Sequence, residues 1–558
     1  MIILVILISV LLRFVNLGST PSGLSVDEAA IGYNAYSILE TGKDEYGQSF
    51  PVLIKSFGDY KAPVYTYLLV PVYKLWGMNV FTTRSISAAA GVITVLFLYL
   101  LIKLLTGNQR LALLSSLLLA LSPWHIMMSR STIESNLALM FMLVGLWAFY
   151  KYIKGAKVFL LAAAAATALA ITTYHSERLV LPLLFLVLGW QYRKTIFRRD
   201  HLGWLAGSLI IGLIIMTPTL QVLGTPAFSG RAKSVSLLSL RTENLWGYLW
   251  SQNLLNNRPL LLARQTTALY SAYFSPKFLF GPDNSRMRHL YPDLGPLLIW
   301  QLPFLLAGAV ILIKSKKDRL KQLVILLLVI SPLPAALSDE PFGMIRVLPL
   351  VVPMSILIAL GLNAFLKRSQ LLGVLVLLAL VILSLGRIYL SVFKLNDYYR
   401  YQDWDYGVDQ IVKEINKLPD KIVQVDGWRG ETYIQLLFFT QFDPVKYQAD
   451  NQDTDPAEYY HPKSISQVKQ IGRIIVKTIN WNRDVVDDRV IVGSFNVLND
   501  DLIKRYCLTE VFRIIAPDNK KLYIGARTNP QVLAKFNQLT QDTKDRSQDC
   551  WAYVQKWP

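Results

Sequence analysis

The sequence predicts a polytopic α-helical membrane protein, with a membrane domain of residues 1–395 followed by a small soluble α/β domain of residues 396–558. The first observation is composition: 53% of the 558 residues are hydrophobic, 17% are charged, and the mean hydropathy is +0.36. These values are typical of a multi-span membrane protein and not of a soluble enzyme. The second is a series of apolar runs, most of them near the ~20 residues that a bilayer requires, which predicts about eleven spans. The third is the polar character of the chain after residue 395.

The apolar runs differ in length and in their flanks. Residues 1–12 lack a preceding basic residue and a small-x-small cleavage site, so we expect an uncleaved spanning helix and not a signal peptide. Residues 62–76 are short and interrupted by Pro71, so we expect an interfacial or re-entrant helix. Residues 179–192 are short for a span unless the charged residues before them lie in a water-filled cavity. The other predicted spans are residues 81–105, 110–128, 133–153, 157–173, 202–220, 294–313, 320–337, 345–366 and 371–393.

The net charge is +19, and the basic residues stand in short clusters between the apolar runs. This arrangement sets membrane orientation, and it argues against nucleic-acid binding. With eleven spans the basic loops share one side, which the positive-inside rule assigns to the cytoplasm together with the N-terminus. The first external loop is then residues 18–80, the long fourth one is residues 221–293, and the C-terminal domain is extracytoplasmic. The basic loops contain Lys103 and Arg110; Lys151, Lys154 and Lys157; Arg193, Lys194, Arg198 and Arg199; Lys314, Lys316, Lys317, Arg319 and Lys321; and Lys367 and Arg368.

The C-terminal domain alternates strand-like and helical runs, which predicts a small α/β fold. Its two cysteines, Cys507 and Cys550, have no Cys-x-x-Cys spacing, so a cysteine-based zinc site is not expected. Outside the cytoplasm they could form a disulfide, and the sequence leaves that pairing open. The strand-like runs are residues 421–425, 474–476 and 490–492, and the helical runs are residues 407–418 and 432–440.

An acidic pair, Asp27-Glu28, follows the first span at the membrane surface. A carboxylate held there can act as a general base that deprotonates an acceptor hydroxyl, and we favour Asp27 for that role. The alternative is a helix cap, because Ser25 followed three residues later by Glu28 fits a capping box. The two functions are compatible, so Asp27 is the candidate catalytic residue and Glu28 a candidate for substrate binding.

Further candidates stand at the ends of the first two external loops. Lys61 next to the headgroup layer would bind a phosphate, with Tyr60 beside it, whereas the alternative is a solvated interfacial lysine. Arg130 and Glu134 lie in a tight hairpin between two spans. They either contact a substrate or act as an interfacial anchor and a helix cap.

Three titratable residues, His175, Glu177 and Arg178, gather at the next membrane boundary. Such residues are costly there unless they pair or line a cavity, so we expect them to bind substrate. The alternative for His175 is a structural role, which is the commoner one for a lone histidine. A Ser-His-Glu hydrolase is rejected because no Gly-x-Ser-x-Gly elbow accompanies them. Arg346 at the end of a late span either extends outward to water or binds an anionic group. His289 lies on the long external loop, which suits recognition of an extended sugar or lipid, or else forms a folded surface.

Four segments carry a family resemblance. They are Gly-Leu-Ser-Val-Asp-Glu-Ala-Ala-Ile-Gly-Tyr-Asn-Ala-Tyr at residues 23–36, Asp-Tyr-Lys-Ala-Pro-Val-Tyr at 59–65, Phe-Thr-Thr-Arg-Ser-Ile-Ser at 81–87 and Arg-Val-Leu-Pro at 346–349. In these segments the chain resembles the membrane-embedded GT-C glycosyltransferases, in particular the branch of protein O-mannosyltransferases and lipid A aminoarabinose transferases. The similarity covers the membrane domain.

This resemblance implies a GT-C-like fold, a polyprenyl-phosphate-linked sugar donor and transfer on the outer face of the membrane. It implies that Asp27 is the base and that Lys61, Arg178 and Arg346 hold the phosphate. Glu134 stands where some branches have an aspartate, so a divalent cation stays open as a cofactor and no metal ligand is assigned. Asp59-Tyr60 precedes the lysine, whereas the aminoarabinose branch has an acid directly before it, which argues against lipid A specificity.

We therefore expect an inverting glycosyltransferase that uses a polyprenyl-phosphate sugar and modifies a hydroxyl of a protein, a lipid or a cell-surface glycan, in contact with membrane lipid and not with nucleic acid. One alternative is a transporter or flippase of a lipid-linked saccharide. Transporters tend to have charged or helix-breaking positions at mid-membrane in paired halves, whereas these titratable residues gather at one surface. Another alternative is a non-catalytic assembly protein, for which a degenerate Asp27 loop would be expected. The loop is intact.

Overall fold

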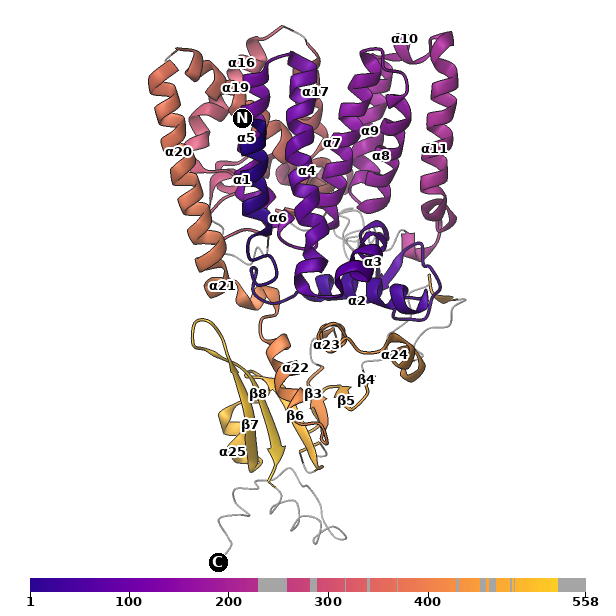
Figure 1. The fold of residues 1–558 in the computed structure, drawn as a ribbon, viewed down its shortest axis with the longest axis vertical. Helices are drawn as coiled ribbons and strands as arrows, with labels where there is room; N and C mark the ends of the chain where they lie inside the picture. Colours follow the sequence, from indigo (N-terminus) through magenta and orange to yellow (C-terminus); the bar gives the residue numbers. More distant parts are fainter. Residues whose placement is uncertain are drawn as a thin grey trace, which may run out of the picture.

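A computed structural model describes residues 1–228, 258–281, 289–316, 318–338, 342–368, 370–427, 431–451, 458–460, 468–481, 484–485 and 487–529. An upright bundle of helices forms one part of the molecule, and a sheet domain lies beyond one end of this bundle (Figure 1). Short helices and a small hairpin of the first external loop separate the two parts.

Apolar helices occupy the segments in which the sequence predicts spans. By length and hydropathy, six of the described helices qualify as membrane spans, or seven if the bent pair α5–α6 counts as one. This confirms a multi-span helical membrane protein, while the number of about eleven spans stays a prediction. The helices of the bundle are α1 (Ile2–Phe14), α4 (Val80–Thr106), α5 (Gln109–Ala120), α6 (Pro123–Ser129), α7 (Glu134–Ile153), α8 (Phe159–Thr173), α9 (Glu177–Gln191), α11 (Leu202–Gln221), α16 (Leu302–Lys314), α17 (Arg319–Ile330), α19 (Val351–Arg368) and α20 (Gln370–Leu390).

The predicted first external loop, residues 18–80, covers one end of the bundle (Figure 1). It contains helix α2 (Val26–Thr41), helix α3 (Val64–Trp76) and an antiparallel hairpin of β1 (Ile54–Ser56) and β2 (Asp59–Lys61). Helix α2 lies across the bundle axis (Figure 1), and it ends at Gly42, whose φ of +70° suits glycine. Helix α3 has 13 residues and exposes Leu75 and Trp76, as expected for the predicted interfacial helix.

Helices α16 and α19 touch through their backbones. A Cβ added at Gly308 would lie 1.8 Å from the carbonyl oxygen of Leu357, and one added at Gly361 would lie 2.1 Å from that of Phe304. Small residues permit such close packing of helices in a membrane. Helices α11 and α20, by contrast, stand at opposite edges of the bundle and expose most of their apolar side chains (Figure 1).

The C-terminal domain is built on a six-stranded sheet with the order β4-β5-β3-β6-β8-β7. Strand β3 pairs in parallel with β5 and β6, and the other described pairs are antiparallel. The strands are β3 (Ile422–Val425), β4 (Lys469–Ile471), β5 (Ile474–Val476), β6 (Arg489–Ser494), β7 (Leu508–Ile515) and β8 (Lys521–Thr528), and the helices are α22 (Val408–Asn416), α23 (Thr432–Thr440), α24 (Pro444–Asp450) and α25 (Asp500–Arg505).

The predicted strands and helices of this domain are therefore present. Helix α22 buries Val408, Ile411, Val412 and Ile415, which is the spacing of one helix face. Cys507 is disulfide-bonded. Cys550 lies outside the described residues, so its pairing with Cys507 stays a prediction.

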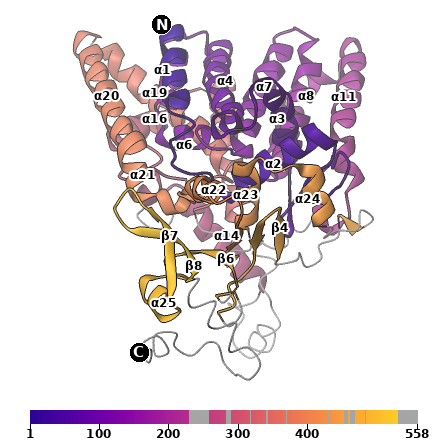
Figure 2. The same cartoon turned by 60° about the horizontal axis from the view of Figure 1, so that its bottom comes forward.

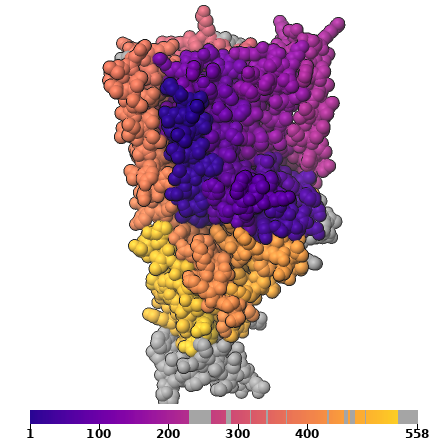
Figure 3. All heavy atoms as spheres, viewed as in Figure 1, coloured from indigo at the N-terminus to yellow at the C-terminus, as the bar shows by residue number. Residues whose placement is uncertain are grey.

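Helices α23 and α24 contact α2, so the C-terminal domain abuts the first external loop (Figure 2). Figure 3 shows the two regions in direct contact along the molecular surface. The remaining elements are α10 (Arg193–Ile196), α14 (Arg258–Ala272), α15 (Pro276–Phe280), α18 (Leu333–Ala336) and α21 (Asn396–Tyr399), the 3-10 helices η1 (Arg199–His201), η4 (Ile299–Gln301), η5 (Leu348–Leu350) and η7 (Tyr401–Trp404), and the π-helix η6 (Ser391–Leu395).

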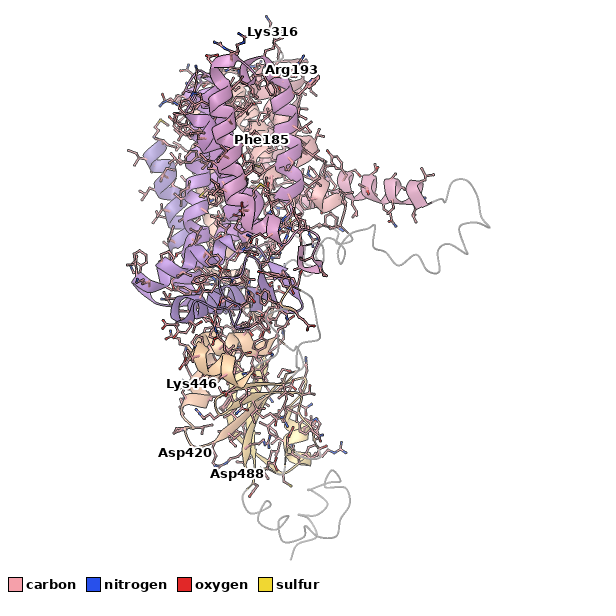
Figure 4. All side chains as sticks on the ribbon, turned by 90° about the vertical axis from the view of Figure 1, so that its right-hand side faces the viewer. Phe185, Arg193, Lys316, Asp420, Lys446 and Asp488 are labelled. Atoms are coloured by element: carbon pink, nitrogen blue, oxygen red, sulfur yellow. The ribbon has the colours of Figure 1, made fainter. Side chains whose placement is uncertain are left out.

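The basic loops and the C-terminal domain lie at opposite ends of the molecule. Arg193 and Lys316, from two of the predicted cytoplasmic loops, mark one end (Figure 4). Asp420, Lys446 and Asp488 of the sheet domain mark the other. The fold thus separates the two ends as the sequence predicts.

Candidate functional site

The acidic pair lies in the first turn of α2, where its two carboxylates have different environments. The Ser25 hydroxyl accepts from the backbone N–H of Glu28, and the Glu28 carboxylate accepts from that of Ser25, so the predicted capping box is present. Glu28 is buried, whereas the Asp27 side chain is 54% exposed. The local fold therefore turns one carboxylate inward and leaves its neighbour open to a substrate.

Glu28 forms a buried ion pair with Arg84 of α4. Arg84 Nε and Nη2 donate to the two carboxylate oxygens at 2.9 and 3.0 Å, and the backbone N–H of Thr132 donates to Oε1 at 3.0 Å. Burial alone would raise the pKa of Glu28, but Arg84 and these hydrogen bonds hold it below its usual value. Glu28 thus ties α2 to α4 and to the start of α7.

Asp27 meets Lys61, which the β1–β2 hairpin carries from 34 residues away. Lys61 Nζ lies 2.6 Å from Asp27 Oδ1, and the lysine side chain is only 12% exposed. The ammonium group also lies 5.4 Å from the ring centre of Phe57 at the hairpin turn. The sequence-based expectation that Asp27 and Lys61 share one site agrees with this geometry.

Tyr60 faces the opposite side of the hairpin, because side chains alternate along a strand. It is buried, and its hydroxyl donates to the backbone carbonyl of Tyr459 in the C-terminal domain. The neighbour of Lys61 therefore contacts protein and not the open side of Asp27.

The turn before α9 packs against the same hairpin. His175 Nε2 lies 3.2 Å from the backbone carbonyl oxygen of Tyr60. The Arg178 guanidinium lies 4.5 Å from the ring centre of Phe228, and Phe228 packs in one apolar cluster with Tyr60. This places residues 175–178 near Lys61.

Glu177 and Arg178 each keep a polar side-chain atom without a hydrogen-bond partner among the described residues. Glu177 is 1% exposed, and its Oε2, like Arg178 Nε, has no hydrogen-bond partner there. Both precede the predicted span of residues 179–192. Burial raises the pKa of Glu177 to about 8 and lowers that of Arg178 to about 10. A polar ligand would satisfy both groups.

The other predicted site residues lie at the same end of the bundle in separate surroundings. Arg130 is fully buried and donates to the carbonyl oxygens of Leu12 and Thr20 at 3.0 and 2.8 Å, so it secures the end of α1. Ile133 is the N-cap residue of α7, and Glu134 follows it in the first turn, where the helix dipole favours a negative charge. Arg346 Nη1 donates to Ser338 Oγ at 3.3 Å. His289 lies in the turn before Leu290; much of the long loop around it lies outside the described residues.

Sequence reasoning did not assign Arg84 to the site. A signal was present, because an arginine in the first turn of a predicted span is costly unless it has a partner. Within the described part of the chain, no group of three or more histidine, cysteine or acidic side chains gathers as a metal would require. A divalent cation thus stays an open expectation.

Residues 60–221 match the model of a family described as dolichyl-phosphate-mannose-protein mannosyltransferase. An uncharacterized protein of Aquifex aeolicus is 31% identical over 199 residues, which cover 33% of this chain, so the chain spans 39% of the length of that relative. The family match covers less than half of the chain, and over that part it agrees with the resemblance predicted from the residues.

Two solved structures illustrate what the chain is similar to. ArnT of Cupriavidus metallidurans bound to undecaprenyl phosphate is 16% identical with a TM-score of 0.46, over 94% of this chain and 97% of that one. The Archaeoglobus fulgidus oligosaccharyltransferase tethered to an acceptor peptide is 13% identical with a TM-score of 0.46, over 78% of this chain and 62% of that one.

Proposed function

We propose that the chain is a membrane glycosyltransferase of the GT-C type, which transfers a sugar from a polyprenyl-phosphate-linked donor to an acceptor hydroxyl; the family match over residues 60–221 supports this proposal. Asp27 is the general base, Lys61 and Arg178 hold the donor phosphate, and the reaction inverts the anomeric centre. The acceptor is a protein, a lipid or a glycan that reaches the end of the bundle next to the C-terminal domain.

The observation that carries this proposal is the contact of 2.6 Å between Lys61 Nζ and Asp27 Oδ1. An exposed carboxylate can take the proton of an acceptor hydroxyl as the oxygen attacks the sugar. A lysine held beside it, largely shielded from water, can neutralise the charge that develops on the departing phosphate. When the donor binds, its phosphate replaces Asp27 as the partner of Lys61, which frees the carboxylate to act as base.

Glu177 and Arg178 supply independent support. A buried carboxylate oxygen of Glu177 and the Nε of the partly buried Arg178, both without a hydrogen-bond partner among the described residues, are unfavourable in the free protein. A lipid-linked sugar phosphate would satisfy both, because the phosphate accepts from Arg178 and a sugar hydroxyl pairs with Glu177. His175 fixes this turn against the hairpin. Arg346 would contribute a further positive charge at the same end of the bundle.

The orientation follows from the distribution of charge. The loops that contain Arg193 and Lys316 lie at the end opposite to the C-terminal domain (Figure 4). By the positive-inside rule that end is cytoplasmic. The Asp27 site and the C-terminal domain then face the outside, where polyprenyl-phosphate sugars would be used.

The test is to incubate the purified protein with a panel of polyprenyl-phosphate sugars and to measure donor consumption. We expect one donor to be consumed. Asp27→Asn should reduce turnover at least about 100-fold, which is the lower end of the rate contribution of a general base. Glu40→Gln is the matched control, because Glu40 is an exposed carboxylate of the same helix. Near-normal turnover by a folded Asp27→Asn variant would remove the assigned base. Movement of intact donor across liposomes, without its consumption, would instead support a flippase.

A further inference from the structure

Two tyrosines of the C-terminal domain each bind one of two adjacent buried carboxylates in the first external loop. Tyr459 Oη donates to Asp44, and Tyr433 Oη donates to Glu45 Oε2 at 3.0 Å. Asp44 is 0% exposed and Glu45 is 1% exposed. Burial raises the pKa of Asp44 to about 6, and the Tyr459 hydroxyl is the largest opposing influence. The loop therefore depends on the C-terminal domain to solvate its buried acids.

The same two tyrosines hold the β1–β2 hairpin. Tyr459 Oη accepts from the backbone N–H of Lys55 at 2.7 Å, and the Tyr459 carbonyl accepts from the Tyr60 hydroxyl. At the hairpin turn the Phe57 ring packs edge-on against Tyr433, with 6.3 Å between the ring centres. The hairpin is thus anchored along β1, along β2 and at its turn.

Anchoring matters because each strand of this hairpin has three residues. An isolated two-stranded hairpin is at best marginally stable in water, so docking must fix its position. Lys61 is the last residue of β2, directly after Tyr60. The place of the lysine ammonium group beside Asp27 is therefore set from the C-terminal side of the molecule.

We propose that Tyr459 and Tyr433 are positioning residues of the transfer reaction, so that the C-terminal domain completes the site by holding Lys61 in place. This inference rests on the proposed function, because it assigns to Lys61 the task of binding the donor phosphate. Neither tyrosine touches the substrate. A displacement of about 1 Å in such a group can cost about 100-fold in rate.

The experiment compares Tyr459→Phe with the wild-type full-length protein in donor turnover. Phenylalanine keeps the ring packing against Tyr60 and Tyr460 but removes the hydroxyl that joins Asp44 to Lys55. We expect kcat/KM for the donor to fall about 10- to 100-fold. Tyr401→Phe is the matched control, because Tyr401 Oη donates to Asp518 at 3.1 Å in the same part of the molecule and away from the hairpin. That variant should retain wild-type turnover.

A double-mutant cycle separates positioning from general stability. In a Lys61→Met background, Tyr459→Phe should cause less than a threefold further loss, because the group that the tyrosine positions is already absent. Full additivity, or wild-type kinetics of Tyr459→Phe in a wild-type Lys61 background, would overturn the inference. If Tyr459→Phe does not fold, Tyr60→Phe removes the hydrogen bond to the Tyr459 carbonyl oxygen and the same cycle applies. Loss of turnover in Asp27→Asn with normal turnover in Tyr459→Phe would leave the proposed function standing and remove only the positioning role.

Discussion

The buried pair of Glu28 and Arg84 allows the two neighbouring acids of α2 to be separated by experiment. Glu28 accepts five hydrogen bonds, from Ser25 N and Oγ, Arg84 Nε and Nη2, and Thr132 N. In Glu28→Gln the amide keeps one acceptor oxygen, whereas its NH2 group replaces the other oxygen and cannot accept from the donors that face it. The Arg84 charge is then buried without its carboxylate. Breaking a buried pair in this way costs about 3–5 kcal/mol.

Asp27→Asn is the contrasting change. Its ion pair with Lys61 is half exposed on the aspartate side, and such pairs contribute about 0.2–1 kcal/mol. The assay is unfolding in detergent micelles followed by tryptophan fluorescence, with donor turnover measured on the same samples. We expect Glu28→Gln to lose several kcal/mol of unfolding free energy, and Asp27→Asn to lose turnover at nearly unchanged stability.

The double variant Glu28→Gln/Arg84→Gln provides the control for the stability argument. Removing both charges avoids the unpaired guanidinium, so its loss of unfolding free energy should be smaller than the sum of the two single losses. Equal stability of Glu28→Gln and wild type, or additive losses in the double variant, would refute the assignment of Glu28 to a buried structural pair.

Two further predictions concern the substrate-binding groups. Lys61→Met should lower kcat/KM for the donor about 10- to 100-fold, because a charge-assisted hydrogen bond to phosphate contributes roughly 1.5–3 kcal/mol. Lys74→Met, on the exposed side of α3, should have no such effect. Equal kinetics of the two variants would contradict the role of Lys61. Glu177→Gln should stabilise the ligand-free protein more at pH 8 than at pH 5. Since the pKa of Glu177 is raised from 4.5 to about 8 in the folded state, the unfolded chain loses this proton first, and wild-type stability falls with rising pH over that window. Thermal unfolding at both pH values, with Glu40→Gln as reference, measures the difference, and a difference that shrinks with rising pH would have the wrong sign.

The membrane fold could be predicted from the sequence because hydropathy and loop charge are local properties of the chain. Every predicted span contains a helix, and the short segment with Pro71 became the interfacial helix α3. Helix boundaries were harder to predict: the segment of residues 110–128, predicted as one span, is bent by 62° between α5 and α6. There Ser122 caps α6 and Pro123 follows it, which are signals of a helix start within an apolar run.

The core of the candidate site could be proposed from the sequence because its residues interrupt the apolar pattern. Titratable groups at a membrane boundary are costly, so each one indicates a functional or structural role. These groups are Asp27, Lys61, Glu177 and Arg178. The function of Tyr459 could not be predicted, because its contacts with Asp44 and Lys55 join segments about 400 residues apart. A tyrosine in a polar domain carries no signal of such a partner.

The glycine contact between α16 and α19 has a consequence for how a lipid-borne donor arrives. The backbones of these two helices are in contact at Gly308 and Gly361, so no lipid tail can pass between them at this point. The hydrocarbon tail of the proposed donor would therefore have to enter from the bilayer at another part of the circumference of the bundle.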